Sequence, residues 1–267
     1  MPKDWSDEFV HHWNYFIGPA RASPSDLRFI KKKILEKDRD AKVLVLGATP
    51  GYRNLCGELD IPVTLIDFKR YNYEYLSDEV KNKPKERFVE GNWMDTVLPE
   101  KFDIILADNV LNVVPTKENI RIVLKNVASM LKKDGLFMPR TYVRGKNERI
   151  DPEKVIKEYR KKRDGSDLYT WLSRDLYLAA YDFKEDVVRF KDIWKVIKKM
   201  HDNGLFTDEE LKEWRNNSFE NREFHFIIPV KEEIEEILSE FFNIKQVFCG
   251  TEEYIHETLP LYVLTLK

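Results

Sequence analysis

The sequence predicts a doubly wound α/β fold in which a parallel β-sheet is covered by helices on both faces. Short apolar runs recur along the first half of the chain, as in strands that are buried on both faces. Segments with helical periodicity separate these runs. Strands that alternate with helices at this spacing form a parallel sheet. The strands expected in this half lie at residues 43–46, 63–66, 88–90, 102–107 and 136–138.

The helices of this half have recognisable ends. Ser23 is suited to cap a helix, Pro24 fits its first turn, and Asp26 adds an acid there. We therefore expect a helix from this point to about residue 37. A second helix is expected over about 117–131, because the basic residues and glycine of 132–135 are typical of a helix end.

The second half of the chain changes character. Residues 144–223 are highly charged, helical in period and rich in aromatic side chains. We expect one domain over residues 1–267, with an N-terminal cap at 1–23 and a helical insertion at about 144–223. After the insertion we expect a return of the sheet pattern, an amphipathic helix and two closing strands, at 224–228, 231–242, 244–249 and 261–266.

Composition argues against several classes of protein. The 45 basic and 47 acidic side chains nearly cancel, whereas a nucleic-acid partner usually requires a basic face. No apolar stretch reaches the roughly 18 residues of a membrane-spanning helix, and the N-terminus lacks a signal-peptide pattern. Cys56 and Cys249 are far apart, and no histidine pair completes a metal site with them. We expect a cytoplasmic protein without a membrane or metal partner.

Three candidate ligand contacts follow strands, where open α/β sheets bind their ligands. The first is the loop Gly47-Ala48-Thr49-Pro50-Gly51, whose glycines let the backbone approach a ligand. The second is Asp67, whose carboxylate can accept hydrogen bonds from ribose hydroxyls. The third is Gly91-Asn92-Trp93-Met94-Asp95, where an amide or acid can accept a hydrogen bond from the adenine amino group and an indole can cover the adenine face. Together they predict a nucleoside-containing cofactor, without separating NAD from S-adenosylmethionine (SAM).

Residues 24–141 and 224–267 resemble the class I, Rossmann-like SAM-dependent methyltransferases. Residues 43–51 are similar to the first motif of that family, Leu65-Ile66-Asp67 to its acidic second motif, and 102–109 to its fourth strand. The closing helix and hairpin resemble those that end the family fold. The resemblance implies methyl transfer from SAM, with a cofactor site formed by Gly47, Ala48, Thr49, Gly51, Asp67, Phe68, Asn92, Trp93 and Asp108, together with Arg21.

Three positions depart from the family pattern. Val45 stands where the family has an acid that helps to hold the methionine amine, Thr49 replaces a glycine, and Asn92 replaces an acid. The methionine end of SAM is therefore expected to be held differently, by Asp108, Asn109 and residues of the N-terminal segment. Charge alone makes Arg21 a partner for its carboxylate.

Candidate catalytic groups are few. Asp108 and Asn112 are expected at the mouth of the site, where they could orient an acceptor or act as a base, although backbone capping at a strand end explains them equally well. His12 could serve as a base because imidazole titrates near neutrality, but His11-His12 is more simply a surface and packing pair. Methyl transfer depends mainly on holding acceptor and methyl in line, so few catalytic groups are needed.

The aromatic insertion favours a small-molecule acceptor enclosed between it and the N-terminal cap. Two other functions share the same sequence features. An NAD(P)-dependent oxidoreductase shares the glycine loop and Asp67 but leaves the C-terminal hairpin unexplained. A methyltransferase-like protein without turnover, binding a nucleoside or a partner, would explain the altered first motif. The sequence leaves a homodimer open.

Overall fold

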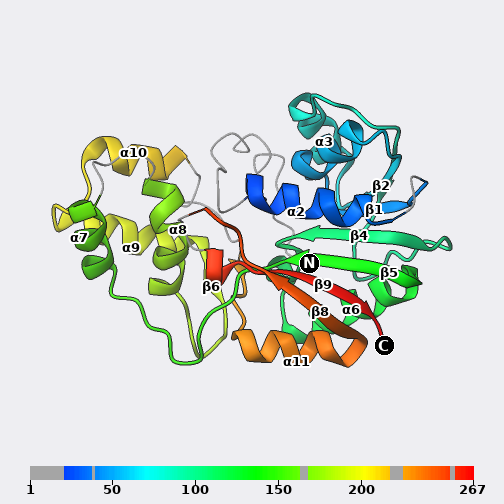
Figure 1. The fold of residues 1–267 in the computed structure, drawn as a ribbon. Coiled ribbons are helices and arrows are strands. Elements are labelled where there is room, and N and C mark those ends of the chain that lie inside the picture. Colours follow the sequence, from blue (N-terminus) through cyan, green and yellow to red (C-terminus); the bar gives the residue numbers. More distant parts are fainter. Residues whose placement is uncertain (1–20, 38–39, 163–167, 217–224, 253–255) are drawn as a thin grey trace.

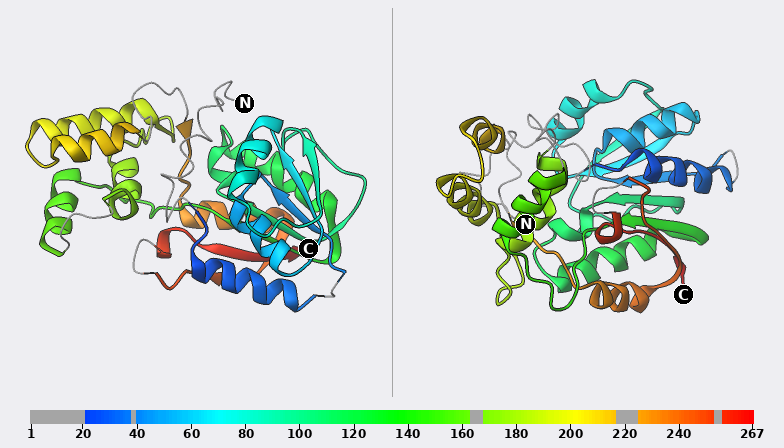
Figure 2. Two further views of the ribbon diagram at one scale, coloured as in Figure 1. Left: turned by 90° about the horizontal axis from the view of Figure 1, so that it is seen from above. Right: turned by 60° about the vertical axis from the view of Figure 1, so that its left-hand side comes forward.

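The structure, a computed structural model, describes residues 21–37, 40–162, 168–216, 225–252 and 256–267. It places a sheet with flanking helices beside a lobe of helices (Figures 1 and 2). The sheet has seven strands in the order β3-β2-β1-β4-β5-β9-β8, of which β1 to β5 run parallel and β9 is antiparallel to both neighbours. This arrangement confirms the predicted α/β fold and its closing hairpin. The strands, in sheet order, are Glu86–Glu90, Val63–Asp67, Val43–Leu46, Phe102–Asp108, Leu131–Arg140, Leu261–Leu266 and Phe242–Phe248.

Helices cover both faces of the sheet, as Figure 1 shows with α2 and α3 on one side and α11 on the other. One core cluster joins α2 and α3 to Val43 and Val45 of β1, and a second joins α6 and α11 to Leu44 and Leu46. All four residues of β1 are buried, which explains its unbroken apolar run. The helices around the sheet are α2 Pro24–Leu35, α3 Pro50–Glu58, α4 Arg70–Leu76, α5 Val110–Val113, α6 Lys117–Met130 and α11 Lys231–Phe241, with short 3-10 turns at Ser77–Glu79 (η2) and His256–Thr258 (η3).

The start of α2 is as predicted. The Ser23 hydroxyl accepts a hydrogen bond from the Asp26 backbone N–H at 3.1 Å, and the Asp26 carboxylate accepts one from the Ser23 N–H at 2.9 Å. This reciprocal pair satisfies two of the backbone donors that a helix start leaves unpaired.

The helix expected over about 117–131 is present as α6, which ends at Met130. The strand expected at 136–138 is longer than predicted, because β5 begins directly after α6 at Leu131, which pairs with Phe102 of β4. The next paired residues are Leu136 and Ile104, so the register shifts across residues 132–135. The pairing partner of Leu131 is distant in sequence, and local residue preferences do not reveal it.

The inserted residues form a helical lobe with a core of its own. That core includes Trp194, Trp214 and Phe226 together with aliphatic side chains such as Leu172 and Ile193. The sheet pattern expected at 224–228 is not part of the main sheet, because β7 pairs only with β6 in a separate two-stranded sheet. The elements of the helical lobe are α7 Pro152–Lys162, α8 Leu168–Ala179, β6 Val188–Arg189, α9 Phe190–Asp202, α10 Asp208–Asn216 and β7 His225–Phe226. No helix in the described ranges is both long and apolar enough to cross a membrane.

A buried ion pair holds α3 to the edge strand β3. The Arg53 side chain is fully buried and donates to both carboxylate oxygens of Glu86, at 2.7 and 2.8 Å. Arg53 also donates to the Ser77 hydroxyl at 2.6 Å, and its guanidinium lies over the Tyr73 ring. Because α3 begins in the loop after β1, this pair indirectly fixes the position of that loop.

We predict that Arg53→Met lowers the free energy of unfolding by about 3–5 kcal/mol, because it leaves the Glu86 carboxylate buried without a cation. Urea unfolding measures the change. The matched control is Arg121→Met, which removes a bidentate pair with Glu240 at the surface and is expected to lose about 1 kcal/mol or less. Equal losses of unfolding free energy in the two variants would show that the buried ion pair contributes no more to stability than the surface pair does.

Candidate functional site

The loop after β1 is shaped for close approach to a ligand. Gly47 has φ of +101°, a backbone conformation that favours glycine. The loop then enters α3, whose N-cap residue Thr49 makes no side-chain capping hydrogen bond. The first backbone N–H groups of α3 are therefore not capped by the Thr49 side chain, and such groups can donate hydrogen bonds to an anion such as a carboxylate.

Asp67 at the end of β2 is tied to the same loop. Its carboxylate accepts a hydrogen bond from the Ala48 N–H at 2.8 Å, and it lies within 3.9 Å of the position that a Cβ atom on Gly47 would take. Burial raises the pKa of Asp67 to about 6, while hydrogen bonds from the Ala48 backbone and the Asn72 side chain oppose the rise. The structure therefore brings the first two predicted contacts together, in a setting where the carboxyl titrates near neutrality.

The third predicted contact has a different role from the one expected. The Trp93 indole is buried in the core, donates to the Ile66 carbonyl at 2.8 Å, and packs against Phe68 with ring centroids 4.4 Å apart. These contacts support the end of β2, so the indole offers little free surface for an adenine. Asn92 accepts a hydrogen bond from the Met94 N–H at 2.9 Å and so shapes its own turn.

A buried charge cluster lies at the ends of β4 and β5. Arg140 donates from Nε to Asp108 Oδ1 at 2.8 Å, and its second terminal nitrogen lies 2.7 Å from the same oxygen. Asp26 of α2 lies 3.8 Å from the remaining terminal nitrogen. Burial raises the pKa of Asp108, and the Arg140 charge opposes this rise. Asp108 is thus engaged by the protein itself, which argues against a free general base at this position.

The segment just before α2 crosses this edge of the sheet. The Ala22 N–H donates to Asp108, and Arg21 lies within electrostatic range of Glu79 at the end of η2. Burial lowers the pKa of Arg21. Arg21 therefore lies near the η2 turn, while Asp26 lies near Arg140 of β5. His12, a candidate base, is outside the described residues.

Asn112 is a structural residue in this arrangement. Its side-chain N–H₂ group donates to the carbonyls of Tyr142 and Ile227, at 3.0 and 2.8 Å. Its carbonyl accepts from the Thr141 hydroxyl and the Tyr142 N–H, both at 2.8 Å. All hydrogen-bonding positions of the buried amide are occupied by protein. The contacts favour a role in joining α5 to the chain that enters and leaves the helical lobe, rather than contact with an acceptor.

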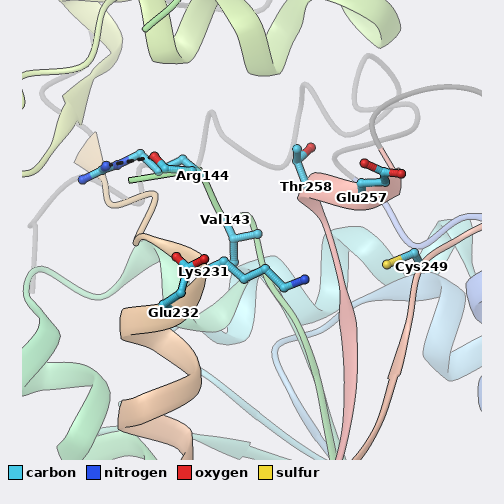
Figure 3. A pocket seen from close by; sticks show the side chains of 8 residues that line it. Val143, Arg144, Lys231, Glu232, Cys249, Glu257 and Thr258 are labelled. Atoms are coloured by element: carbon cyan, nitrogen blue, oxygen red, sulfur yellow. Dashed lines mark hydrogen bonds between the residues drawn. The ribbon is translucent and has the colours of Figure 1, made fainter. Parts of the chain in front are cut away.

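A cavity of about 420 Å³ opens at the same edge, on the hairpin side. Figure 3 shows Lys231 at the start of α11 pointing in the direction of Cys249, at the end of β8. Lys231 has no carboxylate partner among the described residues. Asp26 acts electrostatically on Cys249, which relates the cavity to the charge cluster. The lining residues are Val143, Arg144, Gly145, Lys231, Glu232, Cys249, Glu257 and Thr258. Sequence reasoning missed this cavity, because no motif marks it.

The part of the chain that carries the glycine loop matches a known family. Residues 46–138 match a family model described as a methyltransferase domain. This range runs from the last residue of β1 into β5, so it includes Asp67, Asn92 and Asp108. A comparison with curated protein sequences finds no match.

Solved structures share the fold over almost the whole chain. The CcbJ methyltransferase of Streptomyces caelestis superposes with a TM-score of 0.63 at 10% identity, covering 97% of this chain and 96% of that one. A SAM-dependent methyltransferase of Clostridium acetobutylicum gives 0.56 at 15% identity, covering 97% and 98%. A protein of Rhodobacter sphaeroides, named provisionally as a Zn-dependent alcohol dehydrogenase, gives 0.62 at 16% identity, covering 98% and 97%. At these identities the likeness shows the fold alone.

We predict that Asn112→Ala lowers the free energy of unfolding by about 3 kcal/mol, because several buried polar groups lose their partners. Thermal or urea unfolding measures the loss. Asn203→Ala is the matched control, since its amide donates to Glu153 at the surface and little should change. If Asn112→Ala has wild-type stability, the structural role of Asn112 is contradicted. The amide would then again be a candidate for contact with the methyl acceptor.

Proposed function

We propose that this chain, whose residues 46–138 match a methyltransferase domain, is a class I methyltransferase that transfers the methyl group of its cofactor SAM to a small-molecule acceptor. The observation that carries the proposal is the cavity of about 420 Å³ at the carboxyl edge of the sheet. This volume suits a small molecule rather than the surface of a macromolecule. The bound SAM supplies a methyl group that is already activated by its sulfonium.

The chain's own residues fit this cofactor. The Gly47 backbone and the carboxylate of Asp67 lie side by side, as a ribose that stacks on the loop and donates its hydroxyls requires. The first N–H groups of α3 suit the carboxylate of the methionine end. In this proposal Ala48, Thr49, Gly51, Phe68 and Asn92 complete the cofactor site, and Trp93 supports the strand end from within the core.

The acceptor is placed between the sheet edge and the helical lobe. Tyr142 follows β5 and is buried, and Tyr169 and Arg174 of α8 act electrostatically on it. The hydroxyls of Tyr169 and Tyr177 are 2.8 Å apart. These aromatic side chains border the carboxyl edge of the sheet on the side of the helical lobe. The cavity beside Val143 leaves room there for the acceptor. Such a boundary excludes water and holds the acceptor in line with the methyl group.

We predict that labelled methyl groups from SAM appear in small molecules. The protein is incubated with methyl-labelled SAM and a cell extract, and ultrafiltration then separates small molecules from macromolecules. Label is expected in the filtrate, together with S-adenosylhomocysteine, and Asp67→Ala should abolish both. Label retained with protein or nucleic acid would overturn the small-molecule acceptor. SAM binding without transfer to either fraction would favour the non-catalytic alternative.

The cavity itself is tested by Lys231→Met, which removes the Lys231 ammonium from its wall. Transfer to small molecules should fall by at least tenfold, while calorimetric SAM affinity stays within twofold of wild type. Lys245→Met, at an exposed position of β8, is the matched control and should change neither quantity. Parallel loss of SAM affinity in Lys231→Met would place the cavity in the cofactor site instead.

We predict that SAM affinity depends on the ionisation of Asp67. The pKa of about 6 means that the unliganded carboxyl becomes protonated as the pH falls below 6, and a protonated acid accepts ribose hydroxyls poorly. Affinity should therefore fall by up to about tenfold per pH unit below 6. Calorimetry from pH 5 to 8 measures it. In Asp67→Asn the affinity should be low and the pH dependence lost; an unchanged profile in that variant would remove Asp67 from the ribose site.

A further inference from the structure

We infer that Asp26 and Asp108 together supply the negative charge that holds the methionine ammonium of SAM. They would replace the acid that the family has at the position of Val45. The inference rests on SAM as the cofactor. It assigns a positioning role to a residue outside the matched family region, because Asp26 belongs to α2 and precedes residue 46.

The sheet register places the charge cluster next to Val45. Val45 pairs with Leu106 of β4, and both belong to the core cluster on the α2 and α3 side of the sheet. Side chains two residues apart on a strand point to the same face. Asp108 therefore lies on the face that Val45 occupies, one step nearer to the carboxyl edge, and Arg140 is its direct partner on β5.

The charges of this cluster do not balance. Asp26, Asp108 and Arg140 have side chains that are 5%, 5% and 1% exposed, and together they carry one net negative charge when all three are ionised. A buried unbalanced charge is unfavourable unless a cation complements it. No lysine or further arginine forms an ion pair with either carboxylate among the described residues. The cluster is thus suited to a ligand that brings one positive charge.

Unsatisfied polar atoms mark where such a ligand would bind. Oδ1 of Asp26 is buried and has no hydrogen-bond partner, whereas Oδ2 accepts from the Ser23 N–H. The Tyr52 side chain, fully buried in the first turn of α3, lies within electrostatic range of Asp26, Asp108 and Arg140. An ammonium has three N–H donors and no acceptor, so it complements a free carboxylate oxygen. Val45, by contrast, is surrounded by apolar side chains and cannot provide an acceptor.

This placement also orders the cofactor along the sheet edge. Asp67 and Gly47 lie at the β1 and β2 ends, and the charge cluster lies at β4 and β5, nearer to the cavity. A SAM molecule whose ribose meets Asp67 and whose ammonium meets Asp26 would extend from the nucleoside side towards the acceptor side. Asp26 and Asp108 thus act by orienting the methionine chain and need not exchange a proton.

The test compares two ligands that differ only in the amino group. Calorimetry measures the affinities of S-adenosylhomocysteine and of its analogue that lacks the amino group. The wild-type protein should prefer S-adenosylhomocysteine by at least tenfold. Asp26→Asn removes the charge but keeps an oxygen that can accept from the Ser23 N–H, and it should reduce this preference to less than threefold. The affinity for the deamino analogue should remain within about twofold.

Ser23→Ala is the matched control, since it weakens the same helix cap without changing a charge, and it should keep the wild-type preference. Thermal unfolding verifies that each variant is folded, and Asp108→Asn is the second test, expected to reduce the preference in the same direction. An undiminished preference in both aspartate variants would overturn the inference while leaving SAM as cofactor. Failure of the wild-type protein to bind either ligand would overturn the cofactor and the inference together.

Discussion

The ion pair between Arg140 and Asp108 is the interaction on which the rest of the site depends. The two residues face each other across neighbouring parallel strands, so the sheet register alone brings a guanidinium and a carboxylate together at the carboxyl edge. Once buried there, the pair attracts the start of α2 through Asp26 and the Ala22 N–H. The helix that covers the first core cluster is therefore positioned by the same charges that border the proposed cofactor site.

The carboxyl ends of β1 and β2, where the nucleoside is proposed to bind, are built differently from the charge cluster. A glycine with positive φ, a buried carboxylate and the backbone N–H of Ala48 form one compact unit. Arg53 and Glu86 hold α3 to the sheet edge, and Trp93 fills the space under the end of β2. Rigid support on both sides keeps the loop geometry constant, which is how an enzyme of this kind contributes to catalysis when its cofactor already carries the activated group.

Buried hydrogen bonds and an ion pair join the helical lobe to the sheet domain. Asn112 forms several of these hydrogen bonds, because its amide joins α5 to the segments that run to and from the lobe. The lobe has a hydrophobic core that is distinct from the two clusters packed on the sheet. This separation suits an enzyme in which one part holds a common cofactor and the other selects the acceptor.

The sequence by itself determined the α/β fold, the order of its strands and helices, and the glycine loop with Asp67, because these follow from local periodicity and from spacing along one chain. It could not determine that β5 begins as early as Leu131, that β7 lies outside the main sheet, or that Trp93 is a core residue, because those depend on contacts with residues distant in sequence. Only the tertiary structure decided which charges meet. Asp26 and Arg140 are far apart in sequence, and their approach through sheet register and helix packing creates the unbalanced charge that a sequence motif does not reveal.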